Sequence, residues 1–479
     1  TVNMSDSLKS KTVSGVLWSA IERFSLQGVQ FIINILMARL LLPSDYGMIG
    51  MLAVFLQISQ TFIDSGFSDA LVQKKDRTET DLSTVFYFNI IISVLLYILL
   101  FIGAPYIAQF YRMPELTLVT RIIMLNLIFS SFAAVPKTIL TIRIDFKTQS
   151  KISLISAVVS GVVGIIMAYK GTGVWALVVQ SLLNALLITL LFFYCINWRP
   201  LKVSSKESFQ RLFSFGSKLL FSRLIHALYY NLYSLVIGRK YSSAELGYYT
   251  RAEQFAILPS SNINAIISRV TFPILSNIQD DNVRLASAYR KYIKLASYLI
   301  FPLMVGLAAV AQPLVLLLLT EKWMMAAVLL QILCFDWMFD HLSIINLNLL
   351  YVKGRSDWAL RMEIIKKTIA TLILFASIPF GIEGMCWGRV LYSLIAAYLN
   401  SYYTKSLIGL SLMEQVKDIY PSLLLALFMG GVVFISIGFI THPALQLLAG
   451  ILIGSTCYLF ISYWLHFEAL HEILSMVKR

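Results

Sequence analysis

Two similar ten-residue stretches indicate how this chain is organised. Residues 38–47 read ARLLLPSDYG, and residues 238–247 read GRKYSSAELG. An arginine, an acid and a glycine hold the same places in both copies, 200 residues apart: Arg39, Asp45 and Gly47, then Arg239, Glu245 and Gly247. Each copy stands between two long apolar stretches. Three matched positions at one offset argue against chance similarity, so we interpret the chain as two related halves.

Apolar residues surround both copies over almost the whole chain. The 479 residues are 58% hydrophobic and 13% charged, with a mean hydropathy of +0.76, whereas soluble proteins carry about 25% charged residues. The formal charge is +14, but the basic residues are dispersed between apolar runs and form no patch for a nucleic acid. This composition excludes a soluble protein, a disordered chain and a nucleic-acid binder. It predicts a polytopic membrane protein.

The apolar runs predict about 14 transmembrane helices, because a helix needs about 20 apolar residues to cross a bilayer. Charged residues, prolines and glycines divide the runs into spans near 13–40, 46–72, 82–111, 116–140, 149–169, 173–197, 210–238, 244–275, 284–311, 324–352, 357–380, 383–409, 415–440 and 443–466. Lysine and arginine are abundant in alternate connections and sparse in the others. The positive-inside rule therefore predicts that both termini are cytoplasmic.

We predict an all-α polytopic membrane protein with two six-helix lobes and two further helices. The N-terminal lobe covers residues 1–199 and the C-terminal lobe covers residues 200–409. Residues 410–479 hold the two extra spans and a cytoplasmic tail helix. Because six spans is an even number, both lobes face the same way, as parallel repeats about an axis along the membrane normal.

The first two spans of each half carry the most polar side chains. In the first span these residues recur every three or four positions, which places them in one stripe along a helix. A polar stripe inside a membrane faces either a water-filled cavity or another helix, and we favour a central passage over a packed bundle. The candidate substrate-binding residues are Arg23, Gln27, Gln30, Asn34, Arg121, Arg223, His226, Tyr230, Arg251 and Gln254.

The charges of the seventh span suggest the sign of the substrate. It carries Lys218, Arg223 and His226 without an acid, and guanidinium is the side chain best shaped to bind phosphate. The alternative interpretation, which we favour for Lys218 and for Arg269 of the eighth span, is that such side chains extend to the lipid headgroups. The remaining arginines predict a site for an anionic group.

Four carboxylates within or beside the spans are candidates for coupling transport to protons or sodium: Glu22, Asp64, Asp336 and Asp340. Asp336 and Asp340 lie one helical turn apart in the middle of a span, with His341 beside them. Paired carboxylates in a membrane helix are costly unless they are solvated, paired or protonated. We favour a structural hydrogen-bonded cluster for this pair, with an ion site as the alternative.

Signals for enzyme chemistry are absent from the sequence. There is no G-x-x-x-x-G-K-[ST] motif and no H-E-x-x-H motif. The four cysteines lie far apart inside apolar runs, with no zinc-site spacing. The predicted external connections are too short for the catalytic loop of a membrane glycosyl polymerase or ligase. We therefore predict no catalytic residue, metal or cofactor, and expect a transporter.

The first copy of the repeat, together with FIDSGFSDALVQ at residues 62–73, resembles the bacterial polysaccharide exporters of the multidrug/oligosaccharidyl-lipid/polysaccharide superfamily. These are flippases of the lipopolysaccharide, O-antigen and colanic-acid type. Gly238-Arg239, residues 245–249 (ELGYY) and Gly354-Arg355 fit the second half. The resemblance implies two lobes in a V around a central cavity. It also implies that Arg23 is comparable to the cavity arginines of lipid II flippases.

The resemblance further implies a flippase that moves undecaprenyl-diphosphate-linked oligosaccharide, a repeat unit of surface polysaccharide, across the bacterial inner membrane by alternating access. The expected partners are this lipid-linked substrate and membrane lipids. A polysaccharide polymerase or glycosyltransferase is a candidate protein partner. The protein is expected to be a monomer. A multidrug or organic-cation antiporter of the same superfamily is the alternative, with Asp336 and Asp340 as its cation site. A membrane glycosyltransferase or ligase ranks last.

Overall fold

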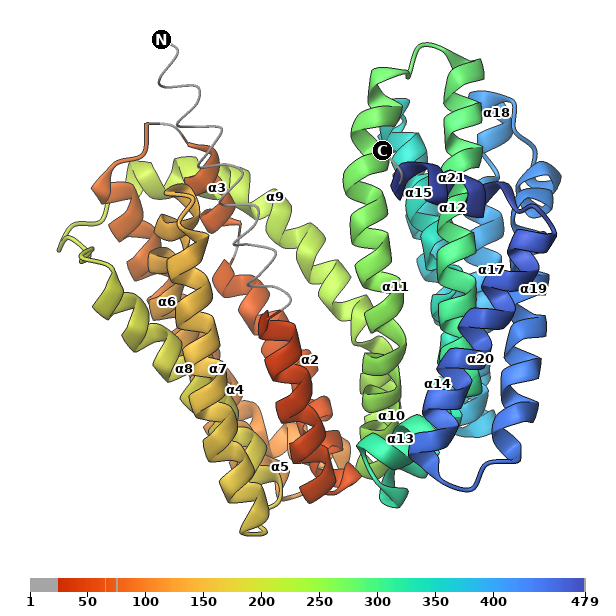
Figure 1. Cartoon of the computed structure of the whole chain (residues 1–479). Coiled ribbons are helices and arrows are strands. Elements are labelled where there is room, and N and C mark those ends of the chain that lie inside the picture. The colour runs from red at the N-terminus through yellow and green to blue at the C-terminus, as the bar shows by residue number, and fades with distance from the viewer. Residues whose placement is uncertain (1–24, 65, 75, 478–479) are drawn as a thin grey trace. The chain divides into compact units, whose positions relative to one another are not determined.

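The computed structural model describes residues 25–477 except 65 and 75, and the chain forms two compact units, Thr1–Gly247 and Tyr248–Arg479. All elements of these described residues are helices (Figure 1). This confirms the predicted fold class, an all-α polytopic protein. Arg23 and Glu22, two predicted site residues, lie outside the described residues.

The first unit contains a helix over Ser25–Leu40 and nine labelled helices. These are α2 (Pro43–Asp64), α3 (Phe67–Gln73), α4 (Glu79–Tyr111), α5 (Leu116–Ile123), α6 (Leu125–Ile142), α7 (Phe146–Tyr169), α8 (Val174–Cys195), α9 (Lys206–Tyr230) and α10 (Leu232–Lys240). The contacts group α9 and α10 with this unit, together with the first turn of α11 (Ser243–Asn277).

The second unit continues with α11 and runs to the tail. Its further helices are α12 (Asn282–Ala309), α13 (Ala311–Leu318), η1 (Glu321–Trp323), α14 (Met324–Trp337), α15 (Asp340–Val352), α16 (Ser356–Ser377), η2 (Ile378–Phe380), α17 (Gly381–Ser401), α18 (Thr404–Ile408), α19 (Leu412–Gly438), α20 (Pro443–Trp464) and α21 (Glu468–Val477). The predicted span at 324–352 is divided into α14 and α15, so Asp336 and Asp340 stand on either side of the break.

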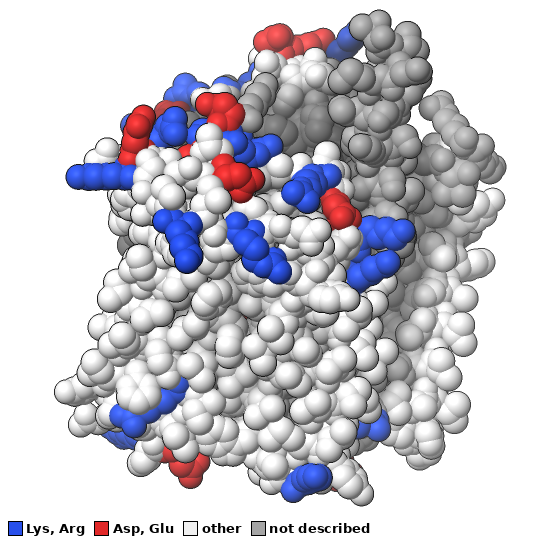
Figure 2. All heavy atoms as spheres, turned by 90° about the vertical axis from the view of Figure 1, so that its left-hand side faces the viewer, with Lys and Arg blue, Asp and Glu red and all other residues white. Residues whose placement is uncertain are grey.

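The outer surface of the helices is largely apolar, as expected for a protein that lies in a membrane. Ten stretches of the described residues are long and apolar enough to cross a membrane, judged by length and composition. Large side chains such as Leu99 (66% exposed) and Ile102 (64% exposed) point outward from α4, as expected where lipid replaces water. Figure 2 shows a broad uncharged belt on one face, with charged side chains gathered toward its two ends. The protein is a multi-pass membrane protein, and the count of 14 spans stays a prediction.

The two copies of the repeated motif form the same turn. One helix ends at Leu40 and α2 begins at Pro43; α10 ends at Lys240 and α11 begins at Ser243. The backbone N–H of Leu42 donates to Asp45 Oδ2 at 2.9 Å, and that of Ser242 donates to Glu245 Oε2 at 2.9 Å. Each acid thereby binds a backbone N–H that precedes its helix. The predicted repeat is confirmed at this turn.

The glycines of the motif lie where the two copies touch. A Cβ added at Gly47 would overlap the backbone carbonyl of Ser243, and a Cβ added at Gly247 would overlap that of Pro43. The contact is therefore reciprocal: the glycine of each copy receives the backbone of the other copy. Only a residue without a side chain allows this approach.

Candidate functional site

A cavity of about 690 Å³ lies inside the first unit, between α2, α6 and α8. Its polar lining residues are Gln57, Gln60, Asp64, Asn126, Ser130, Lys137, Ser181 and Asn184. A second cavity of about 210 Å³ adjoins it and shares Ser181 and Asn184. We call the two together the amide cavity, because seven of their polar side chains are asparagine or glutamine: Gln30, Asn34, Gln57, Gln60, Asn126, Gln180 and Asn184.

Helical spacing brings these side chains to one place. On α2, Gln57, Gln60 and Asp64 are three and four residues apart, which keeps them on one face. Ser181 and Asn184 follow the same rule on α8. The other faces of α2 and α6 are mostly apolar, and two of their polar side chains, Ser59 and Ser131, are buried. Three amphipathic helices therefore enclose a polar space among otherwise apolar spans.

Hydrogen bonding in the amide cavity leaves capacity for a ligand. Asn126 Nδ2 donates to Ser181 Oγ at 2.9 Å, and Gln60 Nε2 donates to Asp64 Oδ1 at 3.4 Å. The buried Oδ1 of Asn184 has no hydrogen-bond partner among the residues that the structure describes. A buried polar atom without a partner is costly unless water or a ligand binds it. The cavity is therefore suited to a molecule that carries hydroxyl or amide hydrogens.

The charges of the larger cavity balance. Lys137 is its basic lining residue and Asp64 its acidic one. Lys137 comes from α6, directly after the buried Pro136. The described lining thus differs from the arginine-rich site that the sequence suggested, because amides supply most of its polarity. An anionic group in this cavity would meet the ammonium group of Lys137.

Several predicted substrate-binding residues lie in or near the first unit's cavities. Gln30 and Asn34 line the smaller cavity, and Gln27 lies on the same helix without lining either cavity. Arg121 donates to the carbonyl oxygen of Phe101 at 3.4 Å, and its guanidinium lies 4.5 Å from the centre of that ring. It does not line the amide cavity.

The predicted residues of the seventh span lie on α9. Arg223 NH2 forms an ion pair with Asp69 Oδ2 at 2.5 Å, and both side chains are about half exposed. The rings of His226 and Tyr230 stack with their centroids 6.2 Å apart. The structure does not bring these residues into the amide cavity. Their role in substrate binding stays a prediction.

Charged residues of the second unit form a separate cluster around Arg389. Its Nε donates to Asp336 Oδ2 at 2.8 Å, and its NH1 contacts both Glu253 and the hydroxyl of Tyr249. Arg389 and Asp336 are buried, with 13% and 9% of their side chains exposed. Asp336 thus pairs with Arg389, and its role in ion coupling stays a prediction.

The other polar residues predicted in the second unit have local partners. Asp340 Oδ2 accepts from Asn264 Nδ2 at 3.0 Å. Arg251 NH1 donates to Gln254 Oε1 at 2.7 Å, which brings together two predicted substrate-binding residues of α11. His341 lies within 2.8 Å of Ser297 Oγ and is fully buried. No group of three potential metal ligands occurs among residues 25–477 that the structure describes.

Sequence reasoning missed the α6 and α8 walls of the amide cavity. Asn126, Ser130 and Lys137 are spaced like one helical face, as are Ser181 and Asn184. This is the same signal that singled out the polar stripe of the first span. The stripes of α6 and α8 are shorter, and only the packing of the three helices shows that they face one space.

A family profile described as "Polysaccharide biosynthesis protein" matches residues 36–328. This chain belongs to that family. The family match covers both copies of the repeated turn, most of the first unit and the beginning of the second, and it confirms the predicted resemblance to polysaccharide exporters.

Relatives of this polysaccharide biosynthesis protein are similar over nearly the whole chain. The teichuronic acid biosynthesis protein TuaB of Bacillus subtilis is 28% identical over 462 residues, which is 95% of this chain and 96% of TuaB. The lipopolysaccharide biosynthesis protein WzxC of Escherichia coli is 25% identical over 428 residues, 88% of this chain and 86% of WzxC.

Two solved structures share the fold. The lipid II flippase MurJ in an inward closed conformation has a TM-score of 0.73, with 17% identity over 94% of this chain and 98% of MurJ. An inward-facing multidrug resistance transporter of the MATE family, from the same superfamily, has a TM-score of 0.62, with 16% identity over 79% of this chain and 94% of that chain. This family member therefore has the fold of these transporters.

Proposed function

We propose that this protein is a flippase that moves an undecaprenyl-diphosphate-linked oligosaccharide from the inner to the outer leaflet of the bacterial cytoplasmic membrane. The amide cavity is the observation that carries the proposal. It is a polar space of two adjoining parts, about 690 and 210 Å³, within apolar helices. The relatives TuaB and WzxC, named for teichuronic acid and lipopolysaccharide biosynthesis, support a saccharide substrate.

The chemistry of the lining suits a saccharide headgroup. Sugar hydroxyls both donate and accept hydrogen bonds, and the amides of asparagine and glutamine do the same. The unpartnered Oδ1 of Asn184 would accept a hydroxyl hydrogen. Lys137 would bind the diphosphate or an acidic sugar. The polyprenyl tail gains nothing from a polar cavity and would remain in the lipid.

The direction of transport follows from the proposed orientation. Lysine and arginine are concentrated in the connections on the side of both termini, which the positive-inside rule assigns to the cytoplasm. An inside-negative membrane potential drives anions outward by about 2.3 kcal/mol per charge per 100 mV. Two diphosphate charges would gain about twice that. Transport of this substrate therefore does not require an ion gradient.

Ion coupling is a separate part of the proposal. Asp64 and Asp340 form no ion pair within the part of the chain that the structure describes, whereas Asp336 is held by Arg389. Asp64 and Asp340 are therefore the described carboxylates that we propose for binding a proton or sodium. Glu22 stays a candidate for the same role.

We propose a monomer whose partners are membrane lipids, the lipid-linked substrate and a polysaccharide polymerase or glycosyltransferase.

Replacing the cavity amides tests the proposal. Asn126→Leu and Asn184→Leu keep the size of the side chain and remove its hydrogen bonds, so each should lower export of surface polysaccharide about tenfold. Export is measured in the native host lacking its own copy, with the amount of protein followed by immunoblotting. Gln109→Leu is the matched control, because Gln109 is exposed and lines neither part of the amide cavity. Full export by both variants at normal protein levels would refute the proposed site.

Lys137 provides a second test, of the anionic group. Lys137→Gln should slow translocation of an undecaprenyl-diphosphate-linked oligosaccharide in proteoliposomes about tenfold, and Lys137→Arg should retain most of the rate, because arginine keeps the charge. The measurement is loss of fluorescence of a labelled substrate to a membrane-impermeant quencher. Equal rates for Lys137→Gln and the unaltered protein would show that Lys137 does not bind the substrate.

The alternative, a cation antiporter, predicts different results. The described lining of the larger cavity carries one acid and one base, which does not favour a cationic substrate. An antiporter would nevertheless expel ethidium in exchange for protons. Ethidium efflux that depends on Asp340, with no movement of lipid-linked saccharide, would support the antiporter and contradict the flippase.

A further inference from the structure

Three basic residues lie on one face of α12, in the N-terminal half that carries all the charged residues of this helix. Arg290, Lys291 and Lys294 lie within little more than one helical turn, and no charged residue follows them between Leu295 and Ala309. In α19 no charged residue follows Asp418, and α20 has none. The basic face of α12 therefore lies where the apolar part of three helices ends, which is the level of the lipid headgroups.

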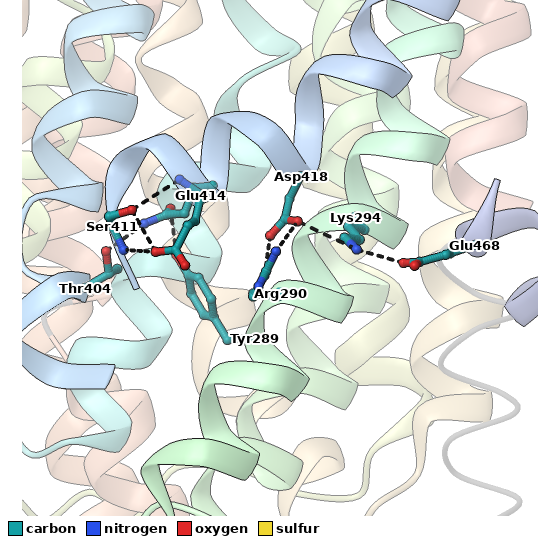
Figure 3. Close-up of polar contacts among 9 residues, drawn as sticks. Tyr289, Arg290, Lys294, Thr404, Ser411, Glu414, Asp418 and Glu468 are labelled. Carbon is teal, nitrogen blue, oxygen red and sulfur yellow. Dashed lines mark hydrogen bonds and ion pairs between the residues drawn. The ribbon is translucent and has the colours of Figure 1, made fainter. Parts of the chain in front are cut away.

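The tail helix α21 covers this basic face with two carboxylates. Lys294 Nζ lies 2.7 Å from Glu468 Oε2, and Lys291 Nζ lies 2.7 Å from Glu472 Oε1. Figure 3 shows Asp418, Lys294 and Glu468 in a row that joins α19, α12 and α21. Glu468 and Glu472 are one helical turn apart, and so match two lysines on a neighbouring helix.

The three basic residues of α12 differ in whether their ion-pair partners belong to α21. Arg290 forms two hydrogen bonds with the buried Asp418, at 2.7 and 2.8 Å, and these remain without the tail helix. Lys294 is also within 3.6 Å of Asp418. Lys291 has Glu472 as its ion-pair partner among the described residues. Removal of α21 would leave three basic residues of α12 with Asp418 and Glu414 of α19 as the acids beside them, so positive charge would still exceed negative charge.

A pocket of about 520 Å³ adjoins these residues. Its walls combine the basic face of α12 with apolar side chains such as Ala286 and Leu410. Its acids are Glu414 of α19 and Glu468 and Glu472 of α21. Lys294 lowers the pKa of Glu468, through a hydrogen bond and its charge, so this carboxylate is ionised at neutral pH. A mixed basic and apolar wall at headgroup level fits a phosphate attached to a glycerol and acyl chains.

We propose that the face of α12 formed by Arg290, Lys291 and Lys294 binds the phosphate headgroup of an anionic phospholipid, and that α21 is the internal acidic competitor for this site. When the lipid binds, α21 leaves α12 and places its apolar residues on the membrane surface. The proposal uses the cytoplasmic orientation given above but does not depend on saccharide transport. Lipid binding can therefore be confirmed even if export proves to have another substrate.

The test compares the full chain in nanodiscs of phosphatidylcholine and in nanodiscs that also contain phosphatidylglycerol. Phosphatidylglycerol should raise the rate of amide hydrogen exchange in α21 about tenfold. Native mass spectrometry should detect retained phosphatidylglycerol. Lys291→Gln/Lys294→Gln should abolish the retention and make exchange in α21 fast in both kinds of nanodisc. Glu468→Gln/Glu472→Gln should also make exchange fast but should increase the retention.

Controls separate this site from general charge effects and other phosphates. Arg361→Gln/Lys405→Gln removes two exposed charges of the same unit outside the pocket and should change neither measurement. Equal exchange of α21 in both nanodiscs, or retention that survives Lys291→Gln/Lys294→Gln, overturns the proposal. The lipid assignment is also overturned if inorganic phosphate or undecaprenyl diphosphate, added to phosphatidylcholine nanodiscs, releases α21 to the same extent.

Discussion

Arg389→Leu is expected to lower the stability of the folded protein by about 3–5 kcal/mol, the cost of leaving one partner of a buried ion pair uncompensated. The guanidinium binds Asp336 and Glu253 and the hydroxyl of Tyr249. Without it, two acids would face one another inside the second unit. The expected result is a large fall in the melting temperature of the protein in detergent, with less folded protein in the membrane.

Two further variants make the Arg389 prediction specific. Arg389→Lys should restore only part of the stability, because one ammonium group cannot reproduce the planar, two-sided contacts of guanidinium. Arg361→Leu is the control, since Arg361 is exposed in the same unit. If Arg389→Leu melts at the same temperature as Arg361→Leu, the cluster does not stabilise the second unit.

Gly47→Ala and Gly247→Ala are expected to prevent normal folding of the first unit, at a cost of about 3 kcal/mol or more each. A methyl group at either position would overlap a backbone carbonyl of the other copy of the motif. Backbone cannot move aside as the end of a flexible side chain can. The amount of monodisperse protein in size-exclusion chromatography, together with its melting temperature, measures the effect.

Gly103 supplies the matched control for the glycine variants. It lies inside α4, and a Cβ built there has no atom of the described residues within 4 Å. Gly103→Ala should therefore leave the yield and the melting temperature close to those of the unaltered protein. Normal yield and melting of Gly47→Ala would contradict the close contact between the two turns.

Much of the fold could be predicted because it depends on local patterns. Apolar runs such as the one in α4 must form helices in lipid, where no water satisfies the backbone. The repeated Asp45 and Glu245 indicated two equivalent turns, and both carboxylates bind the backbone N–H three residues before them. These features need only neighbouring residues, so the sequence is sufficient to recognise them.

The partners of the predicted site residues could not be predicted, because they are distant in sequence. Nothing in the sequence indicated that Arg223, a predicted substrate-binding residue, pairs with Asp69, 154 residues away. Asp336 was noted beside Asp340, yet its ion-pair partner is Arg389, 53 residues away. No spacing rule connects residues so far apart. Their partners follow from which helix faces pack together.

The sequence by itself therefore determined that the protein lies in a membrane, that it is helical, that one turn is repeated and which family it belongs to, because hydropathy and short motifs act over one or two helical turns. Tertiary structure alone decided where the polar side chains meet. It gathered the amides of α2, α6 and α8 around one cavity and placed the acids of α21 on the lysines of α12. The physical reason is that an isolated polar stripe is compatible with a cavity, another helix or an ion pair, and packing selects among them.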